Sequence, residues 1–206
     1  QIGGLITAGQ STPLHWANVN RIFVIFDEDV RGSGLNDSLA TGDFALVGVN
    51  QFAYTISSVS YLYDSAGERG IATLNFASPL PRDRYKLIVN DAAVKDVSGN
   101  ELDGEWTQNV SVGDSGDGVP GGLFELDFNL SPGNFTRDAA GIVNGLDLAT
   151  LGSGYFQGIG SLTYNPFADS NGSGSSNGLD LADMGLNYFT ALPSGCLLYT
   201  SPSPRD

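Results

Sequence analysis

An internal duplication near the C-terminal end constrains this chain most. The segment NGLDLATLGSGYF (residues 144–156) matches NGLDLADMGLNYF (residues 177–189) at nine of thirteen positions, with an offset of 33 residues. In each copy Leu, Ala and aromatic residues recur at three- and four-residue spacing, which gives a helix one apolar face. A unit this small cannot bury a core alone, so the duplication predicts two helices that pack against each other.

A twelve-residue loop, D-S-N-G-S-G-S-S-N-G-L-D, leads into the second copy and runs from Asp169 to Asp180. Oxygen-bearing side chains stand at positions 1, 3, 5, 9 and 12, and a glycine stands at position 6, where the backbone must turn sharply. This is the spacing of an EF-hand-type calcium loop, in which the chain wraps oxygen ligands around the ion. The predicted ligands of this second loop are Asp169, Asn171, Ser173, Ser175 (through its carbonyl), Asn177 and Asp180.

Two carboxylates in this ligand set predict a modest calcium affinity, with Kd roughly 10⁻⁵ to 10⁻³ M. Asn177 is also placed to cap the helix that follows. The alternative is a polar surface turn in which the Asx and Ser side chains bond only to the backbone.

The loop of the first copy departs from this pattern. Its closing residues, Asn144 and Asp147, are kept. The earlier ligand positions match the pattern only if AAG (residues 139–141) replaces the single expected glycine, which makes the loop fourteen residues long. Asn134 then replaces the first Asp, so both an occupied and a metal-free first loop stay open. One Ca²⁺ site is therefore expected, with a second left open. The predicted first-loop ligands are Asn134, Thr136, Asp138, Ile142 (through its carbonyl), Asn144 and Asp147.

The N-terminal two thirds of the chain shows strand signals. Short apolar or alternating runs are separated by turn sequences such as AGERG, SPLPRD and DVSGNELDGE. RIFVIF (residues 21–26) is typical of a fully buried strand, whereas LFELDFNL (residues 123–130) alternates and predicts one buried face. Further strands are expected in DFALVGV, around residues 54–63, and in IATLNFA, RYKLIVN and WTQNVSV. Seven or so short strands predict an antiparallel sandwich.

Two family resemblances follow from these patterns. FVIFDEDV, DFALVGV and YKLIVNDAAVKDVSGNELDGEW resemble the bacterial Ig-like domains of large secreted and surface proteins. The duplicated D-x-N-x-S-G-x-x-N-G-L-D-L pattern, over about residues 132–193, resembles type I dockerin domains. Together they imply a mainly β fold: an antiparallel Ig-like β-sandwich (residues 1–130), followed by a small all-α dockerin-like module of two calcium loop–helix repeats (residues 131–193).

The dockerin resemblance implies a cohesin-like protein partner that binds the helices. In that family the two residues before the closing Asp are often Ser-Thr, but here they are Gly145-Leu146 and Gly178-Leu179, and both leucines could instead be core residues. The resemblances together imply a non-catalytic docking or anchoring region of a secreted or cell-surface protein. Two alternatives stay open: the accessory tail of a secreted polysaccharide-degrading hydrolase, and a sandwich that binds carbohydrate through Trp16, Tyr61 or Trp106.

Composition limits the classes of partner. The chain has 23 Asp plus Glu against 9 Lys plus Arg, a net charge of −14, which argues against nucleic acid and suits a protein that works with divalent cations. No apolar run reaches the length of a membrane span.

Other candidate sites are weaker. The adjacent acids Asp27, Glu28 and Asp29 fit a solvated turn better than a catalytic pair, and His15 is the one histidine. Further acidic and amide side chains could bind a second calcium ion, although turn formation explains them better. They are Asp96, Asn100 and Asp103, or Asp114 and Asp117.

The chain ends are treated separately. The chain starts at Gln1 without a signal segment, so we expect it to be a piece of a longer protein. CLLYTSPSPRD (residues 196–206) resembles the translation of a transposase adapter used in short-read library preparation. Residues 194–206 are therefore predicted to be a non-native tail, and the one cysteine of the chain, Cys196, is left out of the interpretation.

Overall fold

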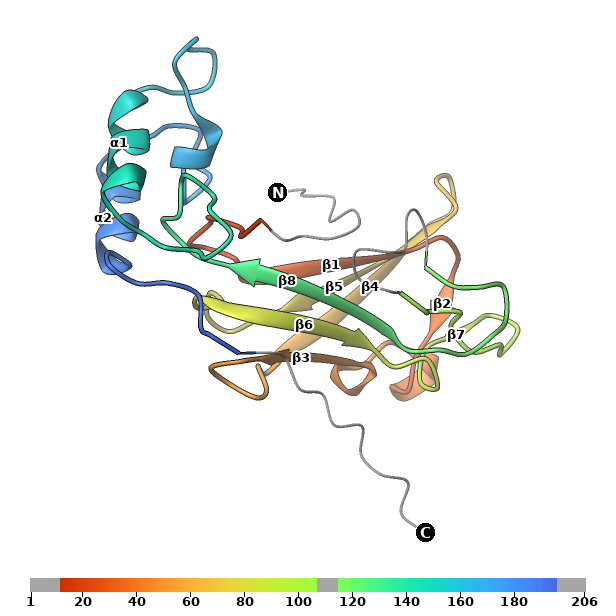
Figure 1. Ribbon diagram of the computed structural model, residues 1–206. Helices are drawn as coiled ribbons and strands as arrows, with labels where there is room; N and C mark the ends of the chain where they lie inside the picture. Colours follow the sequence, from red (N-terminus) through yellow and green to blue (C-terminus); the bar gives the residue numbers. More distant parts are fainter. Residues whose placement is uncertain (1–11, 107–114, 196–206) are drawn as a thin grey trace.

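Strand-forming runs and Gly-rich turns fold into an antiparallel β-sandwich, with a helix-and-loop region at one end (Figure 1). The computed structural model describes residues 12–106 and 115–195. The strands are β1 (Arg21–Phe26), β2 (Val30–Arg31), β3 (Phe44–Gly48), β4 (Ser58–Asp64), β5 (Arg69–Asn75), β6 (Asp83–Val89), β7 (Lys95–Asp96) and β8 (Phe124–Leu130). The helices are α1 (Gly145–Ser153) and α2 (Gly178–Leu186), with 3-10 turns η1 (Leu35–Asp37), η2 (Thr41–Asp43) and η3 (Pro166–Ala168).

Two three-stranded sheets form the sandwich. One has the strand order β1-β5-β4 and the other β3-β6-β8, and the short pair β2-β7 forms a third sheet. All pairings between these strands are antiparallel. The centre of the core is an aromatic stack, in which the ring centroid of Tyr85 lies 5.0 Å from that of Phe128 and 4.9 Å from that of Tyr54. Aliphatic residues from both sheets surround this stack and exclude water from it.

Most of the predicted strands form, but their burial differs in one case. The prediction of a fully buried strand at residues 21–26 is wrong, because Phe23 and Ile25 of β1 are 45% and 58% exposed. Side chains alternate across a strand, and the described residues cover only the inner face of this sheet. The strand predicted in WTQNVSV lies outside the described residues except for Trp106, as do the tail at residues 196–206 and Asp114.

The prediction of a separate all-α module is also wrong. The two helices have only nine residues each, and the chain around them forms turns, the 3-10 turn η3 and an antiparallel bridge between Gly158 and Ser175. Phe156 and Phe189, with φ of 59° and 61°, follow the helices and prevent their continuation. The periodicity therefore located both helices, but the chain around them is not helical.

The helix-and-loop region is also joined to the sandwich rather than separate from it. Arg82 of the sandwich donates a hydrogen bond of 2.8 Å to the Asn187 side chain, and Arg84 Nε donates one of 2.9 Å to the Pro193 carbonyl. Neither helix of the described chain is long and apolar enough to cross a membrane.

Candidate metal centre

The second loop is built around a carboxylate that its own backbone holds. Asp169 follows η3 directly and is nearly buried. Its two oxygens accept the N–H groups of Ser173 (2.9 Å) and Gly174 (2.7 Å). Gly172 and Gly174 have φ of 67° and 86°, a conformation that most side chains disfavour, so these glycines allow the loop to curl back on Asp169.

Three of the predicted second-loop oxygens lie together. Ser173 Oγ lies 3.4 Å from Asp169 Oδ1 and 3.2 Å from the carbonyl oxygen of Ser175. Oxygens that share one Ca²⁺ at about 2.5 Å lie about 3 Å from one another, so this spacing fits a common ion. Asn171 Oδ1 accepts the N–H of Ser173 at 2.9 Å, so that side chain belongs to the same turn.

The closing residues of the second loop organise the start of α2. Asn177 Oδ1 accepts the N–H of Leu179 at 2.9 Å, which confirms the predicted helix cap. The buried Asp180 accepts N–H groups from Ser170 and from Asn177, each at 2.8 Å. Oδ1 of Asp180 also faces Ser170 Oγ and the Asn171 N–H, at 3.2 and 3.4 Å, whereas Oδ2 accepts the Asn177 N–H and has a second lone pair for a cation.

The first loop has an equivalent frame despite its two extra residues. Thr136 Oγ1 donates to the buried Asp147 at 2.8 Å and contacts Asn134 Oδ1 at 3.2 Å. Asn144 caps α1 through the N–H of Leu146, as Asn177 caps α2. Gly141 has a positive φ of 63°, matching Gly174.

Asp138 is the most informative side chain of the first loop. Its Oδ1 accepts the N–H groups of Ala140 (3.0 Å) and Ile142 (3.3 Å). Its Oδ2 is buried and has no hydrogen-bond partner among the described residues. A buried carboxylate oxygen without a partner is costly, and a cation would satisfy it. The residues present therefore fit a cation in the first loop as well as in the second.

The two copies support each other through reciprocal backbone bonds. Phe156 N–H donates to Ser176 O (2.8 Å), and Ser176 N–H donates to Gln157 O (2.9 Å). The same pair recurs 33 residues away, from Phe189 to Val143 O (2.8 Å) and from Val143 to Thr190 O (2.9 Å). Each loop is thus held by the segment that follows the other copy's helix. A shared core fills the space between them: Phe135, Val143, Leu151, Ala168 and Met184.

Three side chains of this centre were not predicted from the sequence. Ser170 Oγ bonds to Asp183 Oδ2 at 2.7 Å and to Asp180 Oδ1 at 3.2 Å. Tyr164 donates its hydroxyl to Asp169 Oδ2 at 2.7 Å, and burial together with this acceptor raises the pKa of Tyr164 to about 12. Ser170 occupies a non-ligand position of the loop pattern, Asp183 follows the loop within α2, and Tyr164 precedes the loop, so the spacing gave no signal for them.

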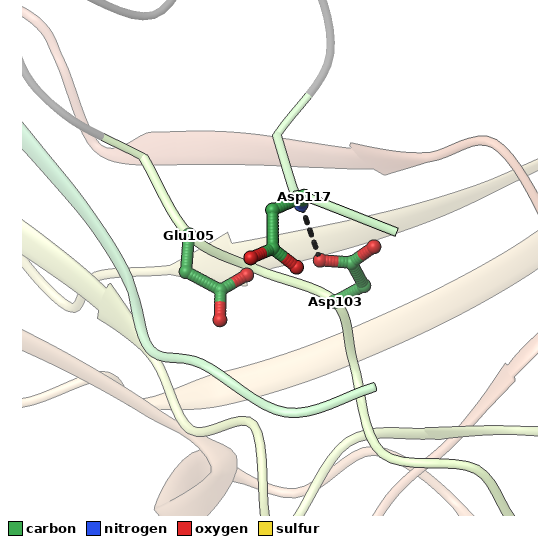
Figure 2. A group of neighbouring side chains, drawn as sticks. All are labelled: Asp103, Glu105 and Asp117. Atoms are coloured by element: carbon green, nitrogen blue, oxygen red, sulfur yellow. Dashed lines mark hydrogen bonds between the residues drawn. The ribbon is translucent and has the colours of Figure 1, made fainter. Parts of the chain in front are cut away.

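A separate acidic group lies at the other end of the sandwich. Asp103, Glu105 and Asp117 offer carboxylate oxygens within 4.8 Å of one another (Figure 2). Asp117 and Gly118 donate their N–H groups to Asp103 at 2.8 and 2.7 Å, and the Asp117 N–H lowers the pKa of the Asp103 carboxyl. These turn bonds account for the proximity of Asp103 and Asp117. Asp96 instead binds Asn100 in its own turn.

The aromatic residues suggested for carbohydrate binding are mostly engaged. The Tyr61 hydroxyl donates to Asp29 at 2.9 Å and accepts the N–H of Val30 at 2.9 Å. Trp106 and Trp16 are half-buried, and their rings lie near Phe124 and His15 respectively.

No family model matches the chain, and no curated protein matches it. Among solved structures, the chain is similar to one chain in a crystal structure of a type II cohesin–X-dockerin complex, a C-terminal interface mutant from Acetivibrio cellulolyticus. The alignment covers 74% of this chain and 83% of that chain, with 17% identity and a TM-score of 0.28. An overlap this loose does not establish a common fold.

Proposed function

We propose that this chain is a non-catalytic, calcium-dependent docking region of a secreted or cell-surface protein. The second loop carries the proposal, because Ser173 Oγ lies 3.4 Å from Asp169 Oδ1 and 3.2 Å from the Ser175 carbonyl oxygen, inside a turn closed by the buried Asp180. Residues 1–130 would form the sandwich, and residues 131–193 the calcium-binding region packed against its end.

Calcium would supply charge compensation and a fixed loop shape. In the second loop the ion would be held by Asp169, Asn171, Ser173, Asn177 and Asp180 and by the Ser175 carbonyl. In the first loop Asp138 and Asp147 would supply the negative charge. Because the ion binds the folded loop, it stabilises the frame from which both helices start.

Exposed apolar residues on that frame support a protein partner. Leu146 and Leu179 are 67% and 65% exposed, so the alternative that they are core residues is wrong. Phe156 and Phe189 are more exposed still, and all four residues occupy equivalent places in the two copies. Exposed leucine and phenylalanine at repeated positions favour a partner with a complementary apolar surface.

Calorimetric titration with Ca²⁺ tests the proposal. We expect binding with a stoichiometry of two and Kd values of roughly 10⁻⁵ to 10⁻³ M. Asp169→Asn should remove one site and Asp138→Asn the other, whereas Asp117→Asn, outside both loops, should leave the stoichiometry unchanged. Absence of any calcium-dependent heat at millimolar Ca²⁺ would contradict the proposal.

A further inference from the structure

One histidine links the sandwich to both candidate calcium loops. His15 is 3% exposed and lies in the segment that leads into the first sheet. Its ring centroid is 5.0 Å from Trp16 on one side and 5.6 Å from Phe167 on the other. The guanidinium carbon of Arg137 lies 4.4 Å from the centroid of the Phe167 ring. The four side chains form a continuous row, Trp16–His15–Phe167–Arg137.

Two members of this row belong to the segments that form the two loops. Arg137 belongs to the first loop, three residues after Asn134. Phe167 belongs to η3 and stands two residues before Asp169, the first residue of the second loop. His15 Nε2 lies 3.3 Å from the carbonyl oxygen of Pro166, which fixes η3 against the histidine. A displacement of either loop therefore disturbs the packing of His15.

Backbone bonds of the same segment reinforce the link. Leu14 exchanges hydrogen bonds with the end of β8, donating to Asn129 O at 2.8 Å and accepting from Ser131 N at 2.7 Å. The His15 carbonyl accepts the N–H of Gly133, directly before Asn134, at 3.2 Å. The Ala17 N–H donates to the carbonyl of Ser170, inside the second loop, at 2.9 Å. Four consecutive residues, 14 to 17, thus contact β8, the first loop and the second loop.

We infer that His15 is a positioning residue that couples calcium binding in both loops to the order of the sandwich end. The inference rests on the proposed function. An ion bound in either loop lowers the population of states in which that loop is open, and opening the loop breaks contacts with residues 14–17. Coupling free energies are reciprocal. If bound calcium strengthens the His15 contacts by a given factor, loss of those contacts must weaken calcium binding by the same factor.

Trp16 makes the coupling observable. The chain has two tryptophans, so Trp106→Phe leaves Trp16 as the reporter. In this background we expect Ca²⁺ to change the Trp16 emission with the same midpoint as the calorimetric titration. His15→Ala should abolish the emission change and weaken calcium binding at least about fivefold. His15→Phe keeps a ring in the row and should restore most of the affinity, a rescue that a general loss of stability would not give.

Control variants separate the row from its surroundings. Phe52→Ala removes an exposed aromatic side chain of the sandwich outside the row and should leave the Trp16 response unchanged. Arg137→Gly serves if His15→Ala fails to fold, because Arg137 has a φ of 58° that glycine adopts more readily. It should weaken calcium binding in the first loop only.

Two measurements keep this inference distinct from the proposed function. If calcium binds but His15→Ala retains full affinity and the Trp16 response, the coupling is wrong and the proposed function stands. If calcium does not bind, the proposed function fails, and hydrogen exchange without calcium decides the coupling. Faster exchange of the Thr136 and Ser170 amides in His15→Ala than in His15→Phe would support the coupling between His15 and the loops. Equal exchange in the two variants would overturn that coupling.

Discussion

The hydroxyl of Tyr155 lies over Gly178, 3.7 Å from the position that a Cβ would occupy on that glycine. The same contact recurs 33 residues away, where the Tyr188 hydroxyl lies 3.7 Å from the corresponding position on Gly145. Each tyrosine follows one helix and covers the first residue of the other. The two copies are therefore related by an approximate twofold exchange, and each depends on the other for packing.

This exchange predicts that truncating either tyrosine lowers the stability of the protein by the same amount. Tyr155→Ala and Tyr188→Ala should each lower the free energy of unfolding by about 2 kcal/mol, less than for a fully buried aromatic residue because both side chains are half-buried. Urea denaturation of both variants measures this. Costs that differ by more than about 1 kcal/mol would argue against a symmetric exchange.

Replacing either of two exposed helical glycines with alanine should stabilise the protein. Gly152 of α1 and Gly185 of α2 are equivalent in the two copies, and a Cβ on either would meet no atom within 4 Å. Gly152→Ala and Gly185→Ala should each raise the free energy of unfolding by about 0.5–1 kcal/mol through higher helix propensity. Denaturation curves check the gain.

Gly174→Ala is a glycine-to-alanine change for which we expect the opposite effect on stability. Gly174 has a φ of 86°, and a Cβ there would lie 3.0 Å from the Ile159 side chain. We expect this variant to lose stability and to weaken calcium binding in the second loop. A stabilising effect would mean that the loop does not need its left-handed turn.

The sequence predicted local features better than long-range ones. The duplication located both helices, and Asn177 was predicted as a cap, because a cap acts within three residues along the chain. The exposure of Phe23 and Ile25 was not predictable, because an apolar run does not show which face of its sheet will be covered. The His15 row joins residues more than 150 positions apart, and no local pattern encodes such a contact.

Calcium should raise thermal stability through mass action. At a free Ca²⁺ concentration about 100-fold above Kd, each occupied loop should add about 2.7 kcal/mol to the free energy of unfolding. Differential scanning calorimetry with calcium and with excess chelator measures the difference. In Asp169→Asn the gain should fall to that of the first loop alone. An unchanged gain in this variant would remove Asp169 from the ligand set.

The buried His15 predicts a loss of stability in mild acid. Burial lowers the pKa of His15 from 6.5 to about 4 and outweighs the opposing effect of the Pro166 carbonyl, while Arg137 lowers the pKa and Asp169 raises it by smaller amounts. Between these two pKa values the unfolded chain binds a proton that the folded chain excludes. The stabilising contribution is therefore complete above about pH 6.5 and is lost progressively as the pH falls toward 4, with a slope of up to about 1.4 kcal/mol per pH unit.

His15→Phe cannot take up this proton and isolates the effect from the carboxylates, which also titrate in acid. Urea denaturation of both proteins at intervals between pH 7 and pH 4.5, in chelator, gives the two stability curves. We expect the wild-type curve to fall more steeply, with the difference between the curves growing steadily below pH 6.5. Parallel curves would show that His15 is protonated as readily in the folded protein as in the unfolded chain, and would contradict its burial between Trp16 and Phe167.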